Sequence, residues 1–384
     1  LPLLSTGPYL LAKPFEGLAT TDLERVSVST IMPVITALLC LVLYELGLAL
    51  GARPMDALLV ALAAAFGTYL LVYSKEFFSE PLMALGVALA LWRSIAGHPT
   101  QAALALVLAM QTRPQAAFLA PFFLLYWVWD MGLRRSLLPG LVLAAGAGSL
   151  LFYNWLRFDN VTTTGYPPDQ GFRLELWTGA WGLVAHGNKS LFLFVPLAIV
   201  LPLGLWALKR RGRTELAALM AAIVLVGFLA AASWSVWYGG WTWGPRLLLP
   251  ALIPVLPVLA VWIRGSARNR RVVLALALAG ALVSLPAVIV PTTAQQNETS
   301  EQRGPTVTRQ YELIGPSIRN TWEHLPPAGA SLGTHPRYLN LWQVSVRREL
   351  GPGGAIVAAL LSLLLLAAAV VSGSLLRRAV RRAG

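Results

Sequence analysis

Charged residues are scarce in this sequence: they make up 12% of its 384 residues, while hydrophobic residues make up 57%. A soluble globular domain carries about twice that share of charge. Apolar runs recur from end to end, and many reach the roughly 17–25 residues that a helix needs to cross a bilayer. They do not alternate polar and apolar residues as the strands of a membrane barrel do. The sequence therefore predicts an all-α polytopic membrane protein.

Cysteine is almost absent. The single Cys40 lies inside an apolar run, which excludes a disulfide framework and a cysteine-based metal site. No spacing of histidine, cysteine and carboxylate residues resembles a structural metal site. The sequence therefore indicates no metal and no cofactor; a divalent cation is compatible with the acidic residues, but no motif points to one.

Acidic residues are also few: 17 Asp and Glu stand against 30 Lys and Arg, a formal net charge of +13. Such a balance is common in proteins that bind nucleic acid. Here, however, the basic residues form short clusters between apolar runs, which is the pattern of the positive-inside rule. We therefore expect membrane lipid, and not nucleic acid, as a partner.

The apolar runs predict about eleven membrane crossings. These lie near residues 29–50, 56–73, 81–97, 99–112, 114–131, 137–157, 190–208, 215–233, 246–263, 272–290 and 354–376. Four regions follow from them. They are the end of an outer loop at the membrane surface (1–28), a transmembrane core (29–290), an extracytoplasmic segment (291–353), and a last helix with a basic tail (354–384).

The basic clusters determine the predicted orientation. With these crossings, the loops GARPMD, LRRS, KRRGR and RGSARNRR and the tail RRAVRR all fall on one side. That side should be the cytoplasm, because short cytoplasmic loops are enriched in Lys and Arg. We expect a multi-pass protein of the bacterial cytoplasmic (inner) membrane with a cytoplasmic C-terminus. Leu1 then lies outside, so we also expect at least one further helix upstream of it.

The run from residue 99 to residue 131 is too long for a single helical crossing, so we expect it to turn at QTRP. The first of its two passes is short, which places Arg113 below the outer surface of the membrane. An arginine facing lipid at that depth would cost at least about 2.5 kcal/mol. We therefore expect Arg113 in contact with protein or with a water-filled cavity.

The stretch SKEFFSEP joins two apolar runs at the outer surface and carries Lys75, Glu76 and Glu80. Glu76 and Glu80 stand four residues apart, so they share one face if the preceding helix continues. A carboxylate at this boundary can act as a general base on a hydroxyl group. The simpler interpretation of Glu80 is a helix start, because an anion just before a proline favours the helix dipole.

Lys13, Lys75 and Lys189 are three of only four lysines, and all three fall on the predicted outer side. One interpretation is a cradle for a lipid phosphate, with Arg113 and Arg246 as further donors. The alternative is that each lysine lies along apolar surface with its ammonium in the interface.

The stretch WSVWYGGWTWGPR precedes a predicted crossing and combines Trp241, Trp243 and Arg246 with three glycines. Tryptophan is common at membrane interfaces, but glycines at this spacing also let backbone approach a ligand. Flat aromatic rings beside an arginine suit a sugar and a phosphate. Neighbouring outer loops add Asn154, Tyr166 and His186, although a lone histidine is more often a polar loop residue than a ligand.

Five segments occur in a characteristic order: TYLLVYSKEFFSEPL, AMQTRPQAAFLAPF, YNWLRFDNVTTTGY, GLVAHGNKSLFLFVP and WYGGWTWGPRLLLP. As a set they resemble bacterial integral-membrane glycosyltransferases of the GT-C type, a group similar to protein O-mannosyltransferases and lipid A aminoarabinose transferases. The resemblance covers residues 1–262. It implies a GT-C-like helical bundle and a hexosyl- or pentosyltransferase. Such an enzyme moves a sugar from a polyprenyl-phosphate donor to an acceptor hydroxyl of a glycan, lipid or protein at the outer face.

The sequence departs from the GT-C pattern at its start. These enzymes generally place the catalytic acidic residue in the first outer loop, and the resemblance implies that this loop lies upstream of Leu1. Glu76 is then the catalytic candidate within the chain, as a second acidic residue. The implied substrate-binding residues are Lys75, Glu80, Arg113, Asn154, Tyr166, His186, Lys189, Trp241, Trp243 and Arg246.

Two other functions fit the same outer-face residues. A flippase or transporter for a lipid-linked sugar would also need cations and aromatic rings, but it should show a charged path through the bilayer or a repeated half. The membrane runs are almost free of acids and show no repeat. The other alternative is a non-catalytic, truncated remnant of a glycosyltransferase.

Overall fold

The computed structural model describes residues 2–13, 28, 30–163, 165–167, 170–173 and 175–289. The expectations for residues 291–353 and 354–384, and for most of residues 14–29, lie outside the described residues. The chain divides into two compact units, one of which contains Met32–Ser284. The short helix α1 (Pro2–Ala12) belongs to the other unit, and the ammonium of Lys13 lies 5.8 Å from the centre of its Tyr9 ring.

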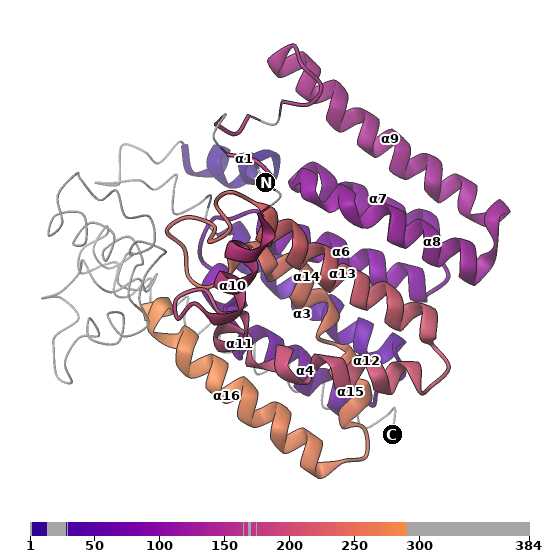
Figure 1. Cartoon of the computed structure of the whole chain (residues 1–384), viewed down its shortest axis with the longest axis vertical. Coiled ribbons are helices and arrows are strands. Elements are labelled where there is room, and N and C mark those ends of the chain that lie inside the picture. The colour runs from indigo at the N-terminus through magenta and orange to yellow at the C-terminus, as the bar shows by residue number, and fades with distance from the viewer. Residues whose placement is uncertain are drawn as a thin grey trace, which may run out of the picture. The chain divides into compact units, whose positions relative to one another are not determined.

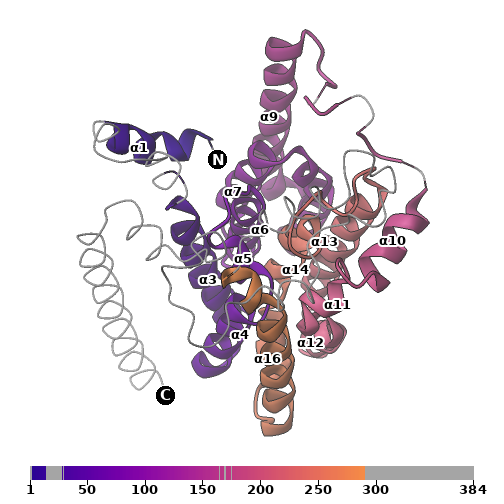
Figure 2. The same cartoon turned by 90° about the vertical axis from the view of Figure 1, so that its left-hand side faces the viewer.

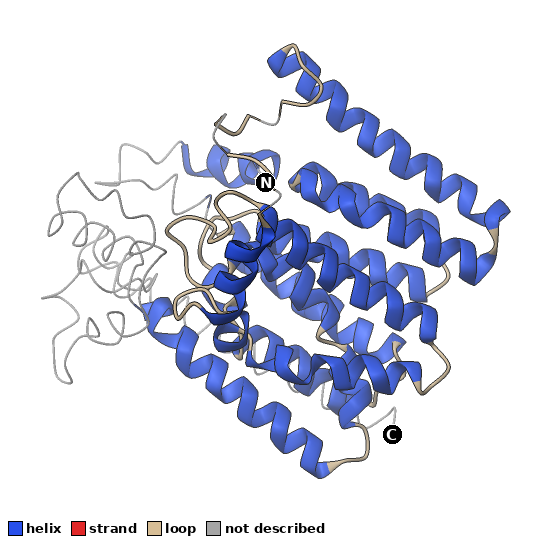
Figure 3. Cartoon of the chain, in the orientation of Figure 1, coloured by secondary structure: helices blue, strands red, loops and turns tan. Residues whose placement is uncertain are grey.

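The described residues form helices and loops (Figures 1 and 3). Within them the structure contains no strand, only an isolated antiparallel bridge between Phe172 and Trp234. The longer elements are α3 (Ile31–Ala49), α4 (Pro54–Phe66), α6 (Glu80–Ile95), α7 (Pro99–Thr112), α8 (Ala120–Met131), α9 (Leu133–Phe158), α10 (Leu176–Ala185), α12 (Leu201–Lys209), α13 (Thr214–Ser233) and α16 (Ala267–Ile289). The shorter elements are α5 (Leu70–Tyr73), η2 (Pro114–Leu119), α11 (Leu191–Phe194), η3 (Pro196–Val200), η4 (Arg246–Leu248), α14 (Leu249–Leu252), η5 (Ile253–Val255) and α15 (Val258–Ile263).

The helical prediction is confirmed over the described residues, and the chain is an all-helical protein in that part. Four helices, α3, α9, α13 and α16, are each long and apolar enough to cross a membrane. This is what a multi-pass membrane protein requires. The number of crossings and their orientation stay predictions.

Several predicted continuous helices are interrupted. The run 56–73 breaks into α4 and α5 because the Thr68 hydroxyl donates to the Ala64 carbonyl at 2.7 Å and accepts from the Leu70 amide at 3.1 Å. Those bonds compete with the helical ladder. The run 190–208 breaks at Pro196, which begins η3 and has no N–H to continue the helix. The run 246–263 likewise contains prolines and forms four short elements.

The connection between the predicted crossings 137–157 and 190–208 has secondary structure of its own. It contains the ten-residue helix α10. Gly179 allows this helix to approach the end of α13, because a Cβ there would lie 2.1 Å from the Ala232 carbonyl oxygen. A short helix that packs on its neighbour in this way gains its stability from tertiary contact more than from its own length.

Helix α6 lies at the centre of the bundle and α9 at its periphery (Figure 1). Residues on nearly every face of α6 are buried, whereas most of α9 is exposed. Small residues allow the close packing between α6 and α7: a Cβ on Gly86 would lie 2.9 Å from Ala105 O, and such close approach is typical of helices in membranes. Helix α6 is therefore enclosed by its neighbours, and its first turn, which is also buried, carries Glu80.

Candidate functional site

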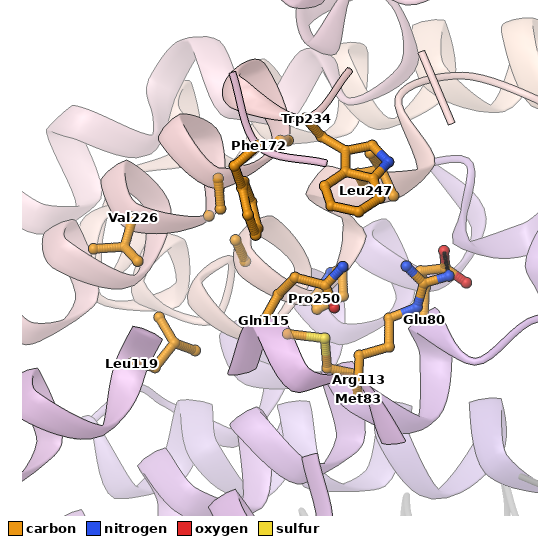
Figure 4. Close-up of a pocket in the computed structure, with 14 residues that line it drawn as sticks. Glu80, Met83, Arg113, Gln115, Leu119, Phe172, Val226, Trp234, Leu247 and Pro250 are labelled. Atoms are coloured by element: carbon orange, nitrogen blue, oxygen red, sulfur yellow. Dashed lines mark ion pairs between the residues drawn. The ribbon is translucent and has the colours of Figure 1, made fainter. Parts of the chain in front are cut away.

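Three segments that are distant in sequence meet at the carboxylate of Glu80. Arg113 Nη2 lies 2.8 Å from Glu80 Oε1, and Arg246 Nε lies 3.2 Å from the same oxygen. The Glu80 side chain is fully buried, and the two arginine side chains are 14% and 15% exposed. The structure thus brings both predicted phosphate-binding arginines to one carboxylate; Figure 4 shows the Arg113 side of this cluster.

Local backbone features position each of these groups. Glu80 begins α6, just before Pro81, as the simpler interpretation of this residue predicted. Arg113 ends α7 in an extended conformation, which is the conformation that a following proline favours. Its Nε donates to Ser79 Oγ at 2.8 Å. Because Ser79 directly precedes Glu80, this hydrogen bond places the Arg113 guanidinium next to the Glu80 carboxylate.

Arg246 begins η4 and is held on two further sides. Its Nη2 donates to the Gly239 carbonyl at 2.8 Å, and its guanidinium carbon lies 4.4 Å from the centre of the Phe78 ring. A guanidinium over an aromatic face is stabilised by the quadrupole of the ring. The orientation of Arg246 is therefore set before any ligand binds.

The charges around Glu80 do not balance. Within the two ion pairs that the described chain forms at this carboxylate, two guanidinium groups face one carboxylate, a surplus of one positive charge in a largely buried position; the charge of Glu76 also acts nearby, on Lys189. A buried charge without a partner is costly, so this arrangement favours a second anion close to the two arginines. Both oxygens of Glu80 also lack a hydrogen bond of good geometry within the described chain.

A narrow cavity of about 50 Å³ adjoins the ion pairs (Figure 4). Its polar end is formed by Glu80, Arg113 and Gln115. The rest of the lining is apolar and aromatic and comes from α6, η2, α13 and α14 and the segments beside them: Met83, Leu119, Phe172, Val226, Gly227, Ala230, Ala231, Trp234, Leu247, Pro250 and Ala251. The cavity has room for about four water molecules, so any larger ligand requires side chains at its mouth to move.

The loop before η4 is held by three side chains through its backbone carbonyl groups. Lys189 Nζ donates to the carbonyls of Gly240, Thr242 and Gly244 at 3.3, 2.6 and 3.2 Å. Tyr73 Oη donates to the Trp243 carbonyl at 2.8 Å, and Tyr69 Oη to the Pro245 carbonyl at 3.2 Å. Sequence reasoning missed both tyrosines; their spacing of four residues beside SKEFFSEP is the signal that could have identified them.

Lys189 therefore positions the loop and does not face the cavity with a free ammonium. It is completely buried. Burial and the nearby Arg246 lower its pKa well below the ordinary value, and Glu76 opposes that shift. Three carbonyl acceptors surround the ammonium, which can donate three hydrogen bonds in all. Lys189 thereby fixes the loop that carries both Arg246 and Gly239, whose carbonyl accepts from Arg246. It positions Arg246 indirectly.

The glycines of this loop allow the backbone conformation that the loop adopts. Gly239, Gly240 and Gly244 all have positive φ, of 74°, 77° and 63°, which other residues rarely adopt. The missing side chain of Gly244 also makes room for Phe194, whose ring would lie 2.7 Å from a Cβ at that position. Phe194 in turn packs edge-on against Trp243 at 5.4 Å.

Lys75 and Glu76 lie in the loop between α5 and α6, not on one helix with Glu80. The condition under which Glu76 and Glu80 would share a helix face is not met, because α5 ends at Tyr73 and α6 begins at Glu80. Burial lowers the pKa of Lys75 to about 8, and the carboxylate of Glu76 opposes that shift. Lys75 is thus expected to lose its charge at a lower pH than an ordinary lysine.

The other predicted ligand residues lie around the site at different depths. Trp243 is fully buried, and Trp241 is half-buried. The Tyr166 ring packs on Trp234, with ring centres 4.9 Å apart, so it reaches the cavity only through that tryptophan. Asn154 Nδ2 donates to the Val161 carbonyl at 3.2 Å, which closes the turn after α9.

His186 lies beside Trp237, with ring centres 6.4 Å apart, and does not line the cavity. Its Nδ1 accepts a hydrogen bond from the Asn188 amide at 3.2 Å. Burial and the positive charge of Lys189 lower the pKa of His186. The imidazole is therefore neutral at pH 7 and helps to form the turn that presents Lys189.

Comparisons with protein-family models, with curated proteins and with solved structures found no match to this chain. Among the residues that the structure describes, no group of three or more His, Cys, Asp and Glu side chains is placed to hold a metal ion. The described site is built from guanidinium, ammonium, carboxylate and aromatic groups. Such groups can bind an anion and accept a proton.

Proposed function

We propose that this chain transfers a sugar from a polyprenyl-phosphate donor to an acceptor hydroxyl. The reaction would take place at the outer face of the cytoplasmic membrane. The observation that carries the proposal is the pair of arginines on the buried Glu80, beside a largely apolar cavity. Together they offer a surplus positive charge for a phosphate and an apolar wall for the adjoining isoprene units. The resemblance to GT-C glycosyltransferases supplies the reaction class.

The phosphate of the donor binds Arg113 and Arg246 at the mouth of the cavity. Each guanidinium has N–H donors beyond those already used for Glu80, Ser79 and Gly239. The first isoprene units lie against Val226 and Leu247, after Met83 and Leu247 change rotamer. Methionine permits such a change at low cost.

In the transfer step, the acceptor oxygen bonds to the anomeric carbon of the sugar. The bond from that carbon to the phosphate oxygen breaks, and its electron pair stays on the phosphate. The phosphate thus gains one negative charge during the reaction. The surplus positive charge of the two arginines interacts more strongly with the product than with the donor, and this is the kind of interaction that accelerates a reaction.

The proton of the acceptor hydroxyl needs a base. Glu76 is the candidate within this chain, since it lies in the loop that also carries Lys75, and its charge acts on Lys75 and Lys189. Glu80 is less suited, because two arginines already hold its carboxylate.

Membranes from cells that express the full chain test the proposal. They are incubated with a panel of polyprenyl-phosphate hexoses and pentoses, each labelled in the sugar. We expect covalent label on a glycan, lipid or protein acceptor, and Arg113→Met should reduce transfer by about 10²–10³-fold. Arg135→Met, an equivalent change at an exposed position of α9, is the control.

Near-normal transfer by Arg113→Met would show that this site does not take part in sugar transfer. Label that crosses the membrane without covalent transfer would favour the transporter alternative. Binding of the donor without either outcome would favour the non-catalytic alternative.

A further inference from the structure

A second buried ion pair joins the beginnings of α4 and α16, at the opposite ends of these helices from the candidate site. Arg270 Nε donates to Asp56 Oδ1 at 2.8 Å. The Asp56 side chain is fully buried, while the Arg270 side chain is 38% exposed. Arg270 thus contacts Asp56 through Nε, and its two terminal nitrogens can donate to another acceptor.

An apolar groove of about 570 Å³ starts at this ion pair and continues between α4 and α16, which lie side by side (Figure 2). Leu59, Leu62 and Phe66 of α4 line one wall, and Leu274 and Leu278 of α16 line the other. The far end is closed by a contact between Gly67 and Gly280, where a Cβ on Gly280 would lie 2.0 Å from Gly67 O. The groove is therefore held at both ends and open along its length. Its volume is within the range of sites that hold a small-molecule ligand, about 300–1,000 Å³.

The length of the groove matches one leaflet of a bilayer. From Arg270 to Ala281 the α16 wall rises about 16 Å, and from Met55 to Gly67 the α4 wall rises about 18 Å, at 1.5 Å per residue. Half of the hydrocarbon core measures about 15 Å. An acyl chain of a single leaflet can thus lie in the groove with its headgroup at Arg270.

The end of the groove at Arg270 belongs to a strongly basic surface. Arg264 Nη1 donates to the Gly51 carbonyl at 2.9 Å, and Arg213 Nη1 donates to the Ala49 carbonyl at 3.0 Å. These contacts bring the loops after α12 and α15 to the loop before α4. Burial, then Arg264 and Arg213, lower the pKa of Arg211, which shows how closely the cations gather. Asp56 is the acid paired with Arg270.

We propose that this groove binds one acyl chain of an anionic glycerophospholipid, whose phosphodiester is held by Arg270. The lipid comes from the leaflet that the basic loops face. Basic pockets between transmembrane helices on that side are suited to anionic headgroups. A free phosphate would leave the groove unfilled, and a zwitterionic lipid would gain less from the surrounding arginines. The proposal is independent of the transfer reaction, because the groove and the Glu80 site share no lining residue.

Native mass spectrometry of the full chain, purified in detergent, tests this site. Dioleoylphosphatidylglycerol and dioleoylphosphatidylcholine are titrated separately. We expect tighter binding of the anionic lipid, and about fivefold weaker binding when Arg270 can no longer donate to the phosphodiester, which is the typical net contribution of one hydrogen bond. The variant is Asp56→Asn/Arg270→Gln, which removes both charges together so that neither remains buried alone.

A second variant tests the apolar part without touching the ion pair. Leu62→Trp places an indole in the groove, and each methylene that it excludes should weaken lipid binding about fourfold. Leu38→Trp on the exposed face of α3 and Arg135→Gln on α9 are the matched controls, since both residues are exposed and neither lines the groove.

Three results would overturn the proposal. The first is equal binding of the two lipids, and the second is an equal loss in Arg135→Gln and in the double variant. The third is unchanged binding in Leu62→Trp, which would place the lipid outside the groove. Selective loss in the double variant and in Leu62→Trp, with both controls unchanged, supports it.

Discussion

Two buried carboxylates, Glu80 and Asp56, occupy comparable positions at opposite ends of the same bundle. Each lies in the first turn of a helix that has a proline at its start, each is fully buried, and each pairs with arginine from a distant part of the chain. They differ in the number of partners. Asp56 has one arginine, whereas Glu80 has two.

This difference separates an ion pair that balances from one that does not. At Asp56 the charges are equal, and the exposed part of Arg270 can be solvated or can bind a headgroup. At Glu80 one positive charge remains beside a cavity, and the arginines are only 14% and 15% exposed. The same local device therefore leaves a balanced pair with an accessible arginine at one end and a net positive cluster beside a cavity at the other.

The largest expected effect concerns Glu76, a second carboxylate in the loop that leads to Glu80. If Glu76 is the base, Glu76→Gln should reduce kcat by about 10²–10⁴-fold, because amides do not accept the proton. The donor should still bind with similar affinity. Transfer of labelled sugar in membranes measures the effect, and full activity of Glu76→Gln would reduce Glu76 to a loop residue.

Arg246→Gln should lower transfer by about 10²–10³-fold, since it removes the surplus charge and leaves a balanced pair of Glu80 and Arg113. That variant makes the Glu80 end resemble the Asp56 end. Arg135→Gln serves as the control for a lost charge at an exposed position. Equal activities of the two variants would show that the surplus charge has no role in the reaction.

Removing the carboxylate should destabilise the protein more at Glu80 than at Asp56. Glu80→Gln leaves two largely buried arginines without their carboxylate and should lower the free energy of unfolding by about 3–5 kcal/mol. Asp56→Asn leaves one arginine that water can reach, and the loss should be about 1–3 kcal/mol. Thermal unfolding of both variants in the same detergent measures the difference. A larger loss in Asp56→Asn would contradict the comparison.

The smallest effect should be a pH dependence that only the Glu80 end shows. The pKa of Lys75 is lowered to about 8, so its positive charge is present below that pH and is lost above it. If Lys75 helps to bind the donor phosphate, kcat/KM should fall about tenfold between pH 7 and pH 9, because the protonated fraction falls by that factor. Lys75→Arg stays charged and should give a flatter profile. An unchanged profile in that variant would assign the titration to another group.

Much of the fold could be predicted from hydropathy, because an apolar run of sufficient length has few alternatives to a helix in a membrane. The interruptions of the helices could not be predicted in this way. Whether Thr68 or Pro196 breaks a helix depends on whether tertiary neighbours supply hydrogen-bond partners for the backbone groups that the break leaves unpaired. Helix α10 was missed because its ten residues form a helix only by packing on the end of α13.

Within the candidate site, residue types were easier to predict than roles. Arg113 and Arg246 could be named from their positions at predicted helix ends, yet their shared partner Glu80 lies 33 and 166 residues away, and no local pattern indicates such a pairing. Lys189 was expected to face a ligand, but it is enclosed by carbonyls of a loop more than fifty residues later. Tertiary structure assigns these partners, because local sequence has no information on which cation meets which acceptor.

Photo-crosslinking tests the central claim most directly. A polyprenyl-phosphate analogue with a diazirine on the isoprene unit next to the phosphate is irradiated with the purified full chain, and the labelled peptides are mapped. The account predicts label at the cavity wall, on peptides that contain Val226 or Leu247, and loss of that label in Arg113→Met or with excess unlabelled lipid. Label confined to the separate apolar groove that Phe192 and Leu225 line, or unaffected by competition, would contradict it.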